Sequence, residues 1–109
     1  MTTFIMLTRV SPEALRSPHA IEALERQAMN AVRSECPEVE WLHSWAVLGA
    51  YDYVDVFHAP DIETATKVAM LVRLAGHATT EVWPATEWPK FKMLVRTLPE
   101  VSGLIMAGA

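Results

Sequence analysis

The sequence predicts an α+β domain, in which one antiparallel four-stranded sheet has two helices packed on a single face. Three observations predict this fold class. The segments follow the order strand, helix, strand, strand, helix, strand; every connection is short; and capping residues mark the changes from strand to helical periodicity. The 109 residues are enough for one such domain with its own core. We assign residues 1–86 to this domain and residues 87–109 to a C-terminal extension.

The first third of the chain contains a strand and a long helix. Residues 3–8 are β-prone and nearly all apolar, as expected for a buried strand. Ser17 then offers a capping hydroxyl directly before Pro18, which suits the first turn of a helix. Apolar residues recur at helical spacing over residues 21–32. The helix ends before Pro37, because the residue that precedes a proline is pushed out of the helical region.

A hairpin and a second helix follow. Residues 39–48 and 53–59 form two strands, and the turn between them contains Gly49 and Asp52, with Asp52 expected to accept hydrogen bonds from turn amides. Asp61 then caps a second helix.

The second helix runs over residues 62–75 with a broad apolar stripe. We expect Gly76 to end it in the left-handed conformation. Residues 77–85 form the last strand. The resulting order of elements is that of a ferredoxin-like βαββαβ unit.

The C-terminal extension combines an amphipathic helix with an uncharged tail. Its apolar residues alternate with basic ones as on one amphipathic helix: Phe91, Leu94, Val95 and Leu98 against Lys90, Lys92 and Arg96. The tail, residues 101–109, contains no charged side chain. It is either disordered, as termini commonly are, or docked on a neighbouring molecule.

Composition excludes several classes of protein. The net charge of −4 argues against a general nucleic-acid binder, since no basic stripe is present to neutralise phosphates. No apolar run approaches the roughly 18–20 residues of a membrane helix. The single Cys36 cannot form an internal disulfide and suits a reducing, cytoplasmic setting. Four Trp and six Met are many for a small monomer, so we expect burial against a second copy, in a homodimer or higher oligomer.

The hairpin sequence Gly49-Ala50-Tyr51-Asp52 resembles the motif for which the GYD domain family is named. Ala59-Pro60-Asp61 and Thr80-Glu81 add to the resemblance, which covers about residues 3–88. It implies a ferredoxin-like fold of the dimeric α+β barrel type, in which two sheets pack face to face and enclose a cavity. That superfamily includes monooxygenases, isomerases, haem enzymes and ligand-sensing domains, so the resemblance implies a fold more than a function.

The face of the sheet away from the helices is the predicted binding site. If Val54 and Val56 point toward the helices, the period of two places Tyr53, Asp55 and Phe57 on the far face. The same reasoning adds Trp41, His43, Trp45, Glu81 and Trp83, with Tyr51 at the turn. Aromatic walls with a few ionisable groups are typical of a small-molecule pocket.

Within this face, His43 and Asp55 are the predicted catalytic residues. A carboxylate that bonds one imidazole nitrogen makes the other a better base, which suits proton abstraction beside a carbonyl. Tyr51 or Tyr53 would then donate to the resulting oxyanion. The substrate would be a small carbonyl or aromatic metabolite.

Two alternatives stand beside catalysis. In the first, the domain is a non-catalytic assembly or sensor module whose C-terminal tail docks on a protein partner. In the second, His43, His58 and His77 bind a divalent metal together with carboxylates. Because no tight His-x-x-x-His spacing is present, the prediction itself includes no cofactor.

Overall fold

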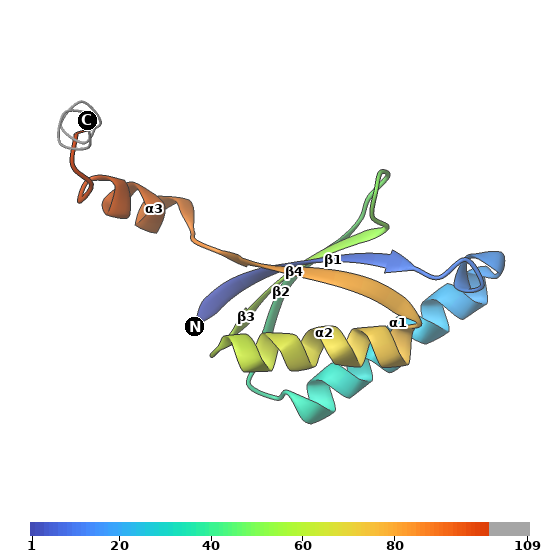
Figure 1. Cartoon of the computed structure of the whole chain (residues 1–109). Helices are drawn as coiled ribbons and strands as arrows, with labels where there is room; N and C mark the ends of the chain where they lie inside the picture. The colour runs from blue at the N-terminus through green and yellow to red at the C-terminus, as the bar shows by residue number, and fades with distance from the viewer. Residues whose placement is uncertain (101–109) are drawn as a thin grey trace.

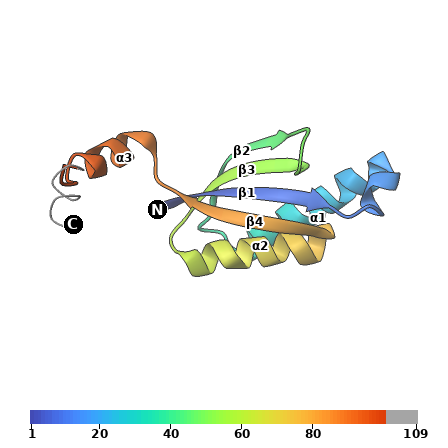
Figure 2. The same ribbon diagram turned by 45° about the horizontal axis from the view of Figure 1, so that its top comes forward.

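The computed structural model describes residues 1–100 and confirms the predicted fold class. Figure 1 shows its elements along the chain. They are β1 (Thr2–Val10), the 3-10 turn η1 (Ala14–Arg16), α1 (Pro18–Glu35), β2 (Glu40–Ala46), β3 (Tyr53–Ala59), α2 (Ile62–Gly76), β4 (Ala78–Ala85) and α3 (Trp88–Val95). The antiparallel sheet has the strand order β2-β3-β1-β4, and α1 and α2 both lie on one side of it (Figure 2).

Local caps begin both long helices where the sequence predicts. The Ser17 side chain accepts a hydrogen bond from the backbone N–H of Ala20 at 3.4 Å. Asp61 Oδ1 accepts one from the backbone N–H of Thr64 at 2.8 Å. These bonds satisfy backbone donors that a helix leaves free in its first turn.

The end of α2 differs from the prediction by one residue. Gly76 is the last helical residue, and His77 adopts the left-handed conformation, with φ 49° and ψ 55°. Gly76 is buried where a Cβ atom would lie 3.6 Å from Cβ of Ala28 in α1. That distance is ordinary van der Waals contact, so packing against α1 does not require a glycine here. The turn is made by the exposed His77, a residue type that tolerates the left-handed conformation.

The core lies between the sheet and the two helices. Phe4, Met6, Phe57 and Val68 are among its most deeply buried side chains. The Phe57 ring stacks between those of Phe4 and Trp41, with centroid distances of 5.6 and 5.2 Å. This aromatic stack fixes β1, β2 and β3 against one another.

Strand pairing places the residues of β3 on the faces opposite to those predicted. Tyr53, Asp55 and Phe57 pair with Thr8, Met6 and Phe4 of β1, whose side chains are buried on the helix side. Val54 and Val56 therefore face outward, and the predicted assignment of the two faces was wrong for this strand. Both sets of alternate residues in β3 are half-buried or buried, so the period of two alone does not indicate which set faces the core.

The α3 helix lies apart from the rest of the domain in both views (Figures 1 and 2). None of its residues is buried, and the Trp88 side chain is 67% exposed. The predicted amphipathic helix is thus present in the extension, whereas the division at residue 86 stays a prediction. The tail of residues 101–109 lies outside the described residues. Over residues 1–100, no helix is long and apolar enough to span a membrane.

Candidate functional site

A cavity of about 270 Å³ lies between α1 and the helix-facing side of the sheet. Small residues from four separate elements leave this space open: Ala28 of α1, Ala46 of β2, Gly76 of α2 and Ala78 of β4. Most of the remaining wall is apolar, with Met6, Leu24, Met29 and Val72 among the side chains that line it. Its apolar walls are typical of a site for a small molecule, and its volume lies just below the usual range of about 300–1,000 Å³ for such sites.

Polar groups converge on the cavity from β1, β2 and β3. Asp55 and Tyr53 line it from β3, Ser44 from the adjoining β2, and Thr8 from β1. Glu25 approaches from α1. A few polar groups in an apolar cavity are what orients a ligand.

Asp55 is the half-buried carboxyl group of this cavity. Burial raises the pKa of the Asp55 carboxyl group, and the negative charge of Glu25 acts in the same direction. Hydrogen bonds with the Ser44 and Trp41 side chains oppose this shift. The Trp41 Nε1–H donates to Ser44 Oγ at 2.8 Å, which leaves the Ser44 hydroxyl proton free to bond to Asp55.

Thr8 contributes a buried hydroxyl that has no hydrogen-bond partner within residues 1–100. Thr8 is 3% exposed and pairs with Tyr53 across β1 and β3. Burial also raises the pKa of the Tyr53 phenol, and the charges of Asp52 and Glu25 add to this effect. A buried hydroxyl without a partner costs about 1–3 kcal/mol, and a water or ligand atom that reached it from the cavity would remove that cost.

A β-bulge in β2 separates the residues that were predicted to act together. The register shifts between Trp41 and His43, so Trp41 pairs with Phe57 on the helix side while His43 pairs with Val56 on the outer side. His43 and Asp55 therefore lie on opposite faces of the sheet. The predicted placement of both on one face was wrong, because a bulge adds one residue and reverses the alternation beyond it.

The outer face has its own aromatic cluster. The rings of His43 and Trp45 stack with centroids 5.1 Å apart. Glu81 accepts hydrogen bonds from the Tyr51 hydroxyl and from Trp83 Nε1, the latter at 3.3 Å. Of the predicted site residues, this face thus holds His43, Trp45, Tyr51, Glu81 and Trp83, whereas Trp41, Tyr53, Asp55 and Phe57 face the helices.

The hairpin motif has a clear structural role. The Ala50 carbonyl accepts a hydrogen bond from Arg9 Nε at 2.9 Å, and the Tyr51 hydroxyl reaches across β1 to Glu81 in β4. Asp52 Oδ2 accepts from the backbone N–H of Val10 at 2.8 Å. The expectation that Asp52 bonds to turn amides was therefore wrong: its carboxylate fixes the hairpin to β1.

The three histidines considered as metal ligands lie apart. His58 is flanked by carboxylates of Glu40 and Glu87, with both nitrogen–oxygen distances 3.6 Å. His77 lies at the end of α2, and His43 lies on the outer face. Within residues 1–100, no three His, Cys, Asp or Glu side chains are placed to hold a metal ion.

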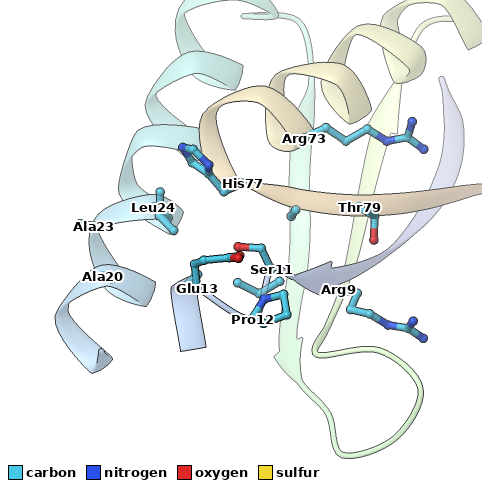
Figure 3. A pocket seen from close by; sticks show the side chains of 13 residues that line it. Arg9, Ser11, Pro12, Glu13, Ala20, Ala23, Leu24, Arg73, His77 and Thr79 are labelled. Carbon is cyan, nitrogen blue, oxygen red and sulfur yellow. The ribbon is translucent and has the colours of Figure 1, made fainter. Parts of the chain in front are cut away.

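A second hollow of about 950 Å³ lies beside η1, the first half of α1 and the start of β4 (Figure 3). Its charged side chains do not converge. Figure 3 shows the guanidinium groups of Arg9 and Arg73 extending away from Glu13 and His77. Arg9 donates to the Ala50 carbonyl and Arg73 to Thr80 Oγ1, so both already have partners. The smaller cavity under α1 is therefore the better candidate site.

Several solved structures share this fold. The leucine response regulatory protein LrpA of Mycobacterium tuberculosis aligns with a TM-score of 0.53 at 14% identity, over 79% of this chain and 51% of that one. A feast or famine regulatory protein of the same organism, complexed with L-methionine, aligns with a TM-score of 0.56 at 14% identity, over 80% and 51%. This chain thus spans about half the length of these two proteins. The TTHA0845 protein of Thermus thermophilus aligns with a TM-score of 0.54 at 22% identity, over 80% of this chain and 95% of that one.

The sequence comparison identifies the family. A comparison with curated proteins found no match. Residues 4–95 match the family model of the GYD domain, so the match includes α3 and extends beyond residue 88, where the predicted resemblance ended. The chain belongs to the GYD domain family.

Proposed function

We propose that this protein binds a small molecule in the cavity between α1 and the sheet. The observation that supports it best is the convergence of the Asp55 carboxyl, the Tyr53 phenol and the Thr8 hydroxyl, which has no partner within residues 1–100, on one largely apolar cavity. A cavity of about 270 Å³ has the volume of roughly nine liquid water molecules, which suits a small metabolite rather than a polymer. The likeness to a regulatory protein complexed with L-methionine is compatible with a binding module of this fold.

The proposal concerns binding and not catalysis. The predicted acid–base pair requires contact between the His43 imidazole and the Asp55 carboxylate, and the sheet lies between them. Asp55 instead faces Ser44 and the cavity. Its role in the proposal is to bond a polar group of the ligand.

The test is to fill the cavity at a tolerant position. Ala46 lines the cavity from an exposed place on β2, so Ala46→Leu adds volume without disturbing the core. Ala50→Leu is the matched control, because Ala50 is exposed on the hairpin and only its carbonyl makes a bond. A fragment library would be screened against the native protein by NMR chemical-shift mapping.

We expect hits that shift the Trp41 and Tyr53 resonances. Binding of these hits should weaken by about tenfold in Ala46→Leu, because the leucine side chain occupies volume that the ligand needs, and should be unchanged in Ala50→Leu. A library with no hit at these residues, or hits indifferent to Ala46→Leu, would overturn the proposal.

A second candidate function is self-association through the outer face of the sheet. Trp45 and Trp83 are about half exposed there, beside Ile5, Val54 and Val56. An antiparallel sheet with an apolar second face is normally covered by something. This surface would pack against the same surface of a second copy, as the dimeric α+β barrel arrangement requires.

The mass in solution tests this second candidate. Analytical ultracentrifugation should give the native chain a mass above the 12.2 kDa of one copy. Trp83→Glu should restore the single-copy mass, whereas Leu15→Glu, on the equally exposed η1 turn, should not. A native protein that sediments as one copy would refute it.

We also propose a cytoplasmic location, which the single, buried Cys36 thiol supports.

A further inference from the structure

We propose that the cavity under α1 selects an organic ammonium ion, that is, a cationic amine attached to a small apolar body. This inference rests on the proposed binding function and adds the chemical class of the ligand. Four features of the cavity support it, namely its charge, the state of its carboxylate, its aromatic rings and its buried hydroxyl.

The first feature is the sign of the charge. The ionisable side chains that line the cavity are Glu25, Tyr53 and Asp55, and no Lys, Arg or His within residues 1–100 lines it. Glu22, one turn before Arg26 on the same helix, pairs with that arginine at 3.6 Å, whereas no such ion pair is formed by Glu25 among the described residues. The cavity therefore has acidic groups without a cation to balance them.

The second feature is that the Asp55 carboxylate lacks a countercharge. Burial and the neighbouring Glu25 both raise its pKa, which means that its ionised form is disfavoured in the free protein. A bound ammonium group would supply the missing positive charge. An anionic ligand would instead add a like charge next to Glu25 and Asp55.

The third feature is aromatic. The rings of Trp41 and Tyr53 line the cavity from β2 and β3, and one face of the Trp41 ring already packs on Phe57. A cation near the face of a Trp or Tyr ring is attracted by the negative charge density of that face. Carboxylates together with aromatic rings are thus a suitable set of partners for an ammonium ion.

The fourth feature is the Thr8 hydroxyl. Its buried oxygen has free lone pairs, and an ammonium group has three N–H donors to distribute among its neighbours. One donor would bond to Thr8 Oγ1 and another to Asp55. A neutral hydroxyl can also serve both groups, by donating to Asp55 and accepting from the Thr8 O–H, but it brings no positive charge to offset the carboxylate.

The experiment compares three probes with the same ring: benzylamine, benzyl alcohol and benzoate. Binding to the full native chain is measured by NMR chemical-shift titration of the Trp41 indole N–H. We expect benzylamine to bind about tenfold more tightly than benzyl alcohol, because it adds charge–charge and cation–π attraction. Benzoate should not bind.

Charge-neutralising variants then identify the groups responsible. Asp55→Asn should abolish the preference for benzylamine over benzyl alcohol, and Glu25→Gln should reduce it. Glu22→Gln is the matched control, because Glu22 is exposed on the same helix and lies outside the cavity. It should leave the preference unchanged.

The outcomes separate this inference from the proposed function. If benzyl alcohol binds as tightly as benzylamine and Ala46→Leu weakens both, the ammonium selectivity is wrong and the cavity still binds ligands. If benzylamine does not bind while neutral or anionic library fragments do, the inference is likewise wrong. If the preference survives both Asp55→Asn and Glu25→Gln, the amine binds elsewhere and the inference fails.

Discussion

Replacing Asp52 by alanine tests whether the hairpin motif acts by supporting the sheet. Asp52 Oδ2 accepts the backbone N–H of Val10 at 2.8 Å, and its own backbone N–H donates to the Thr8 carbonyl at 2.8 Å. Val10 is 6% exposed, so water does not readily replace the carboxylate. Asp52→Ala keeps the backbone bond and removes only the side-chain acceptor.

The expected cost follows from that geometry. A hydrogen bond between a charged group and a buried donor contributes about 1.5–3 kcal/mol to the free energy of unfolding. In a domain of this size, each kcal/mol lowers Tm by about 4–8 °C. Asp52→Ala should therefore lower Tm by about 6–24 °C. Asp52→Asn retains an acceptor oxygen without the charge, so its loss should be clearly smaller.

Thermal unfolding followed by circular dichroism measures these shifts. Amide hydrogen exchange adds a local readout, because the Val10 N–H should exchange faster in Asp52→Ala than in the native protein. An alanine variant with native Tm and native exchange at Val10 would refute the reasoning. Equal losses for Asp52→Ala and Asp52→Asn would show that the acceptor oxygen is not what matters.

Further predictions concern the cavity and the core. Burial raises the pKa of Asp55 in the folded state, so the protonated form stabilises the fold relative to the ionised form. This stabilisation is lost as the pH rises through the raised pKa. Asp55→Asn should therefore raise Tm at neutral pH and give no gain below about pH 3.9, and a lower Tm at neutral pH would contradict this. Thr8→Val removes the unpartnered hydroxyl and should stabilise the free protein by about 1–3 kcal/mol in urea unfolding, whereas a destabilised variant would show that the hydroxyl is satisfied. Phe57→Ala should lower the free energy of unfolding by about 3–5 kcal/mol, because the ring is fully buried. Phe91→Ala on α3, where the residue is 43% exposed, should change it by no more than about 0.5 kcal/mol. Similar losses for the two variants would argue that α3 is packed.

The elements of the fold were predictable because their signals are local. Ser17 before Pro18 and Asp61 after Pro60 mark the starts of the two long helices, and both side chains make the expected capping bonds. The predicted strand of residues 53–59 has the same bounds as β3. Such signals act over a few residues, so the order of elements, and with it the antiparallel topology, follows from them.

The candidate site was predictable only in part. Asp55, Tyr53 and Trp41 were among the predicted residues and do line a cavity, although on the opposite side of the sheet from the one expected. Thr8 and Glu25 were missed. Thr8 continues the alternation of the buried Phe4 and Met6 along β1, and a polar residue in that buried series was the signal that could have identified it.

The chain's local patterns are thus enough to define strands, helices, caps and the hairpin motif. The faces of the strands depend instead on which residues pair across the sheet, and one bulge beside Trp41 changes the answer for every residue beyond it. The cavity likewise depends on small residues from α1, β2, α2 and β4, which are distant in sequence and meet only after folding. Periodicity relates neighbours along one element, whereas pairing register and packed volume are properties of the assembled domain.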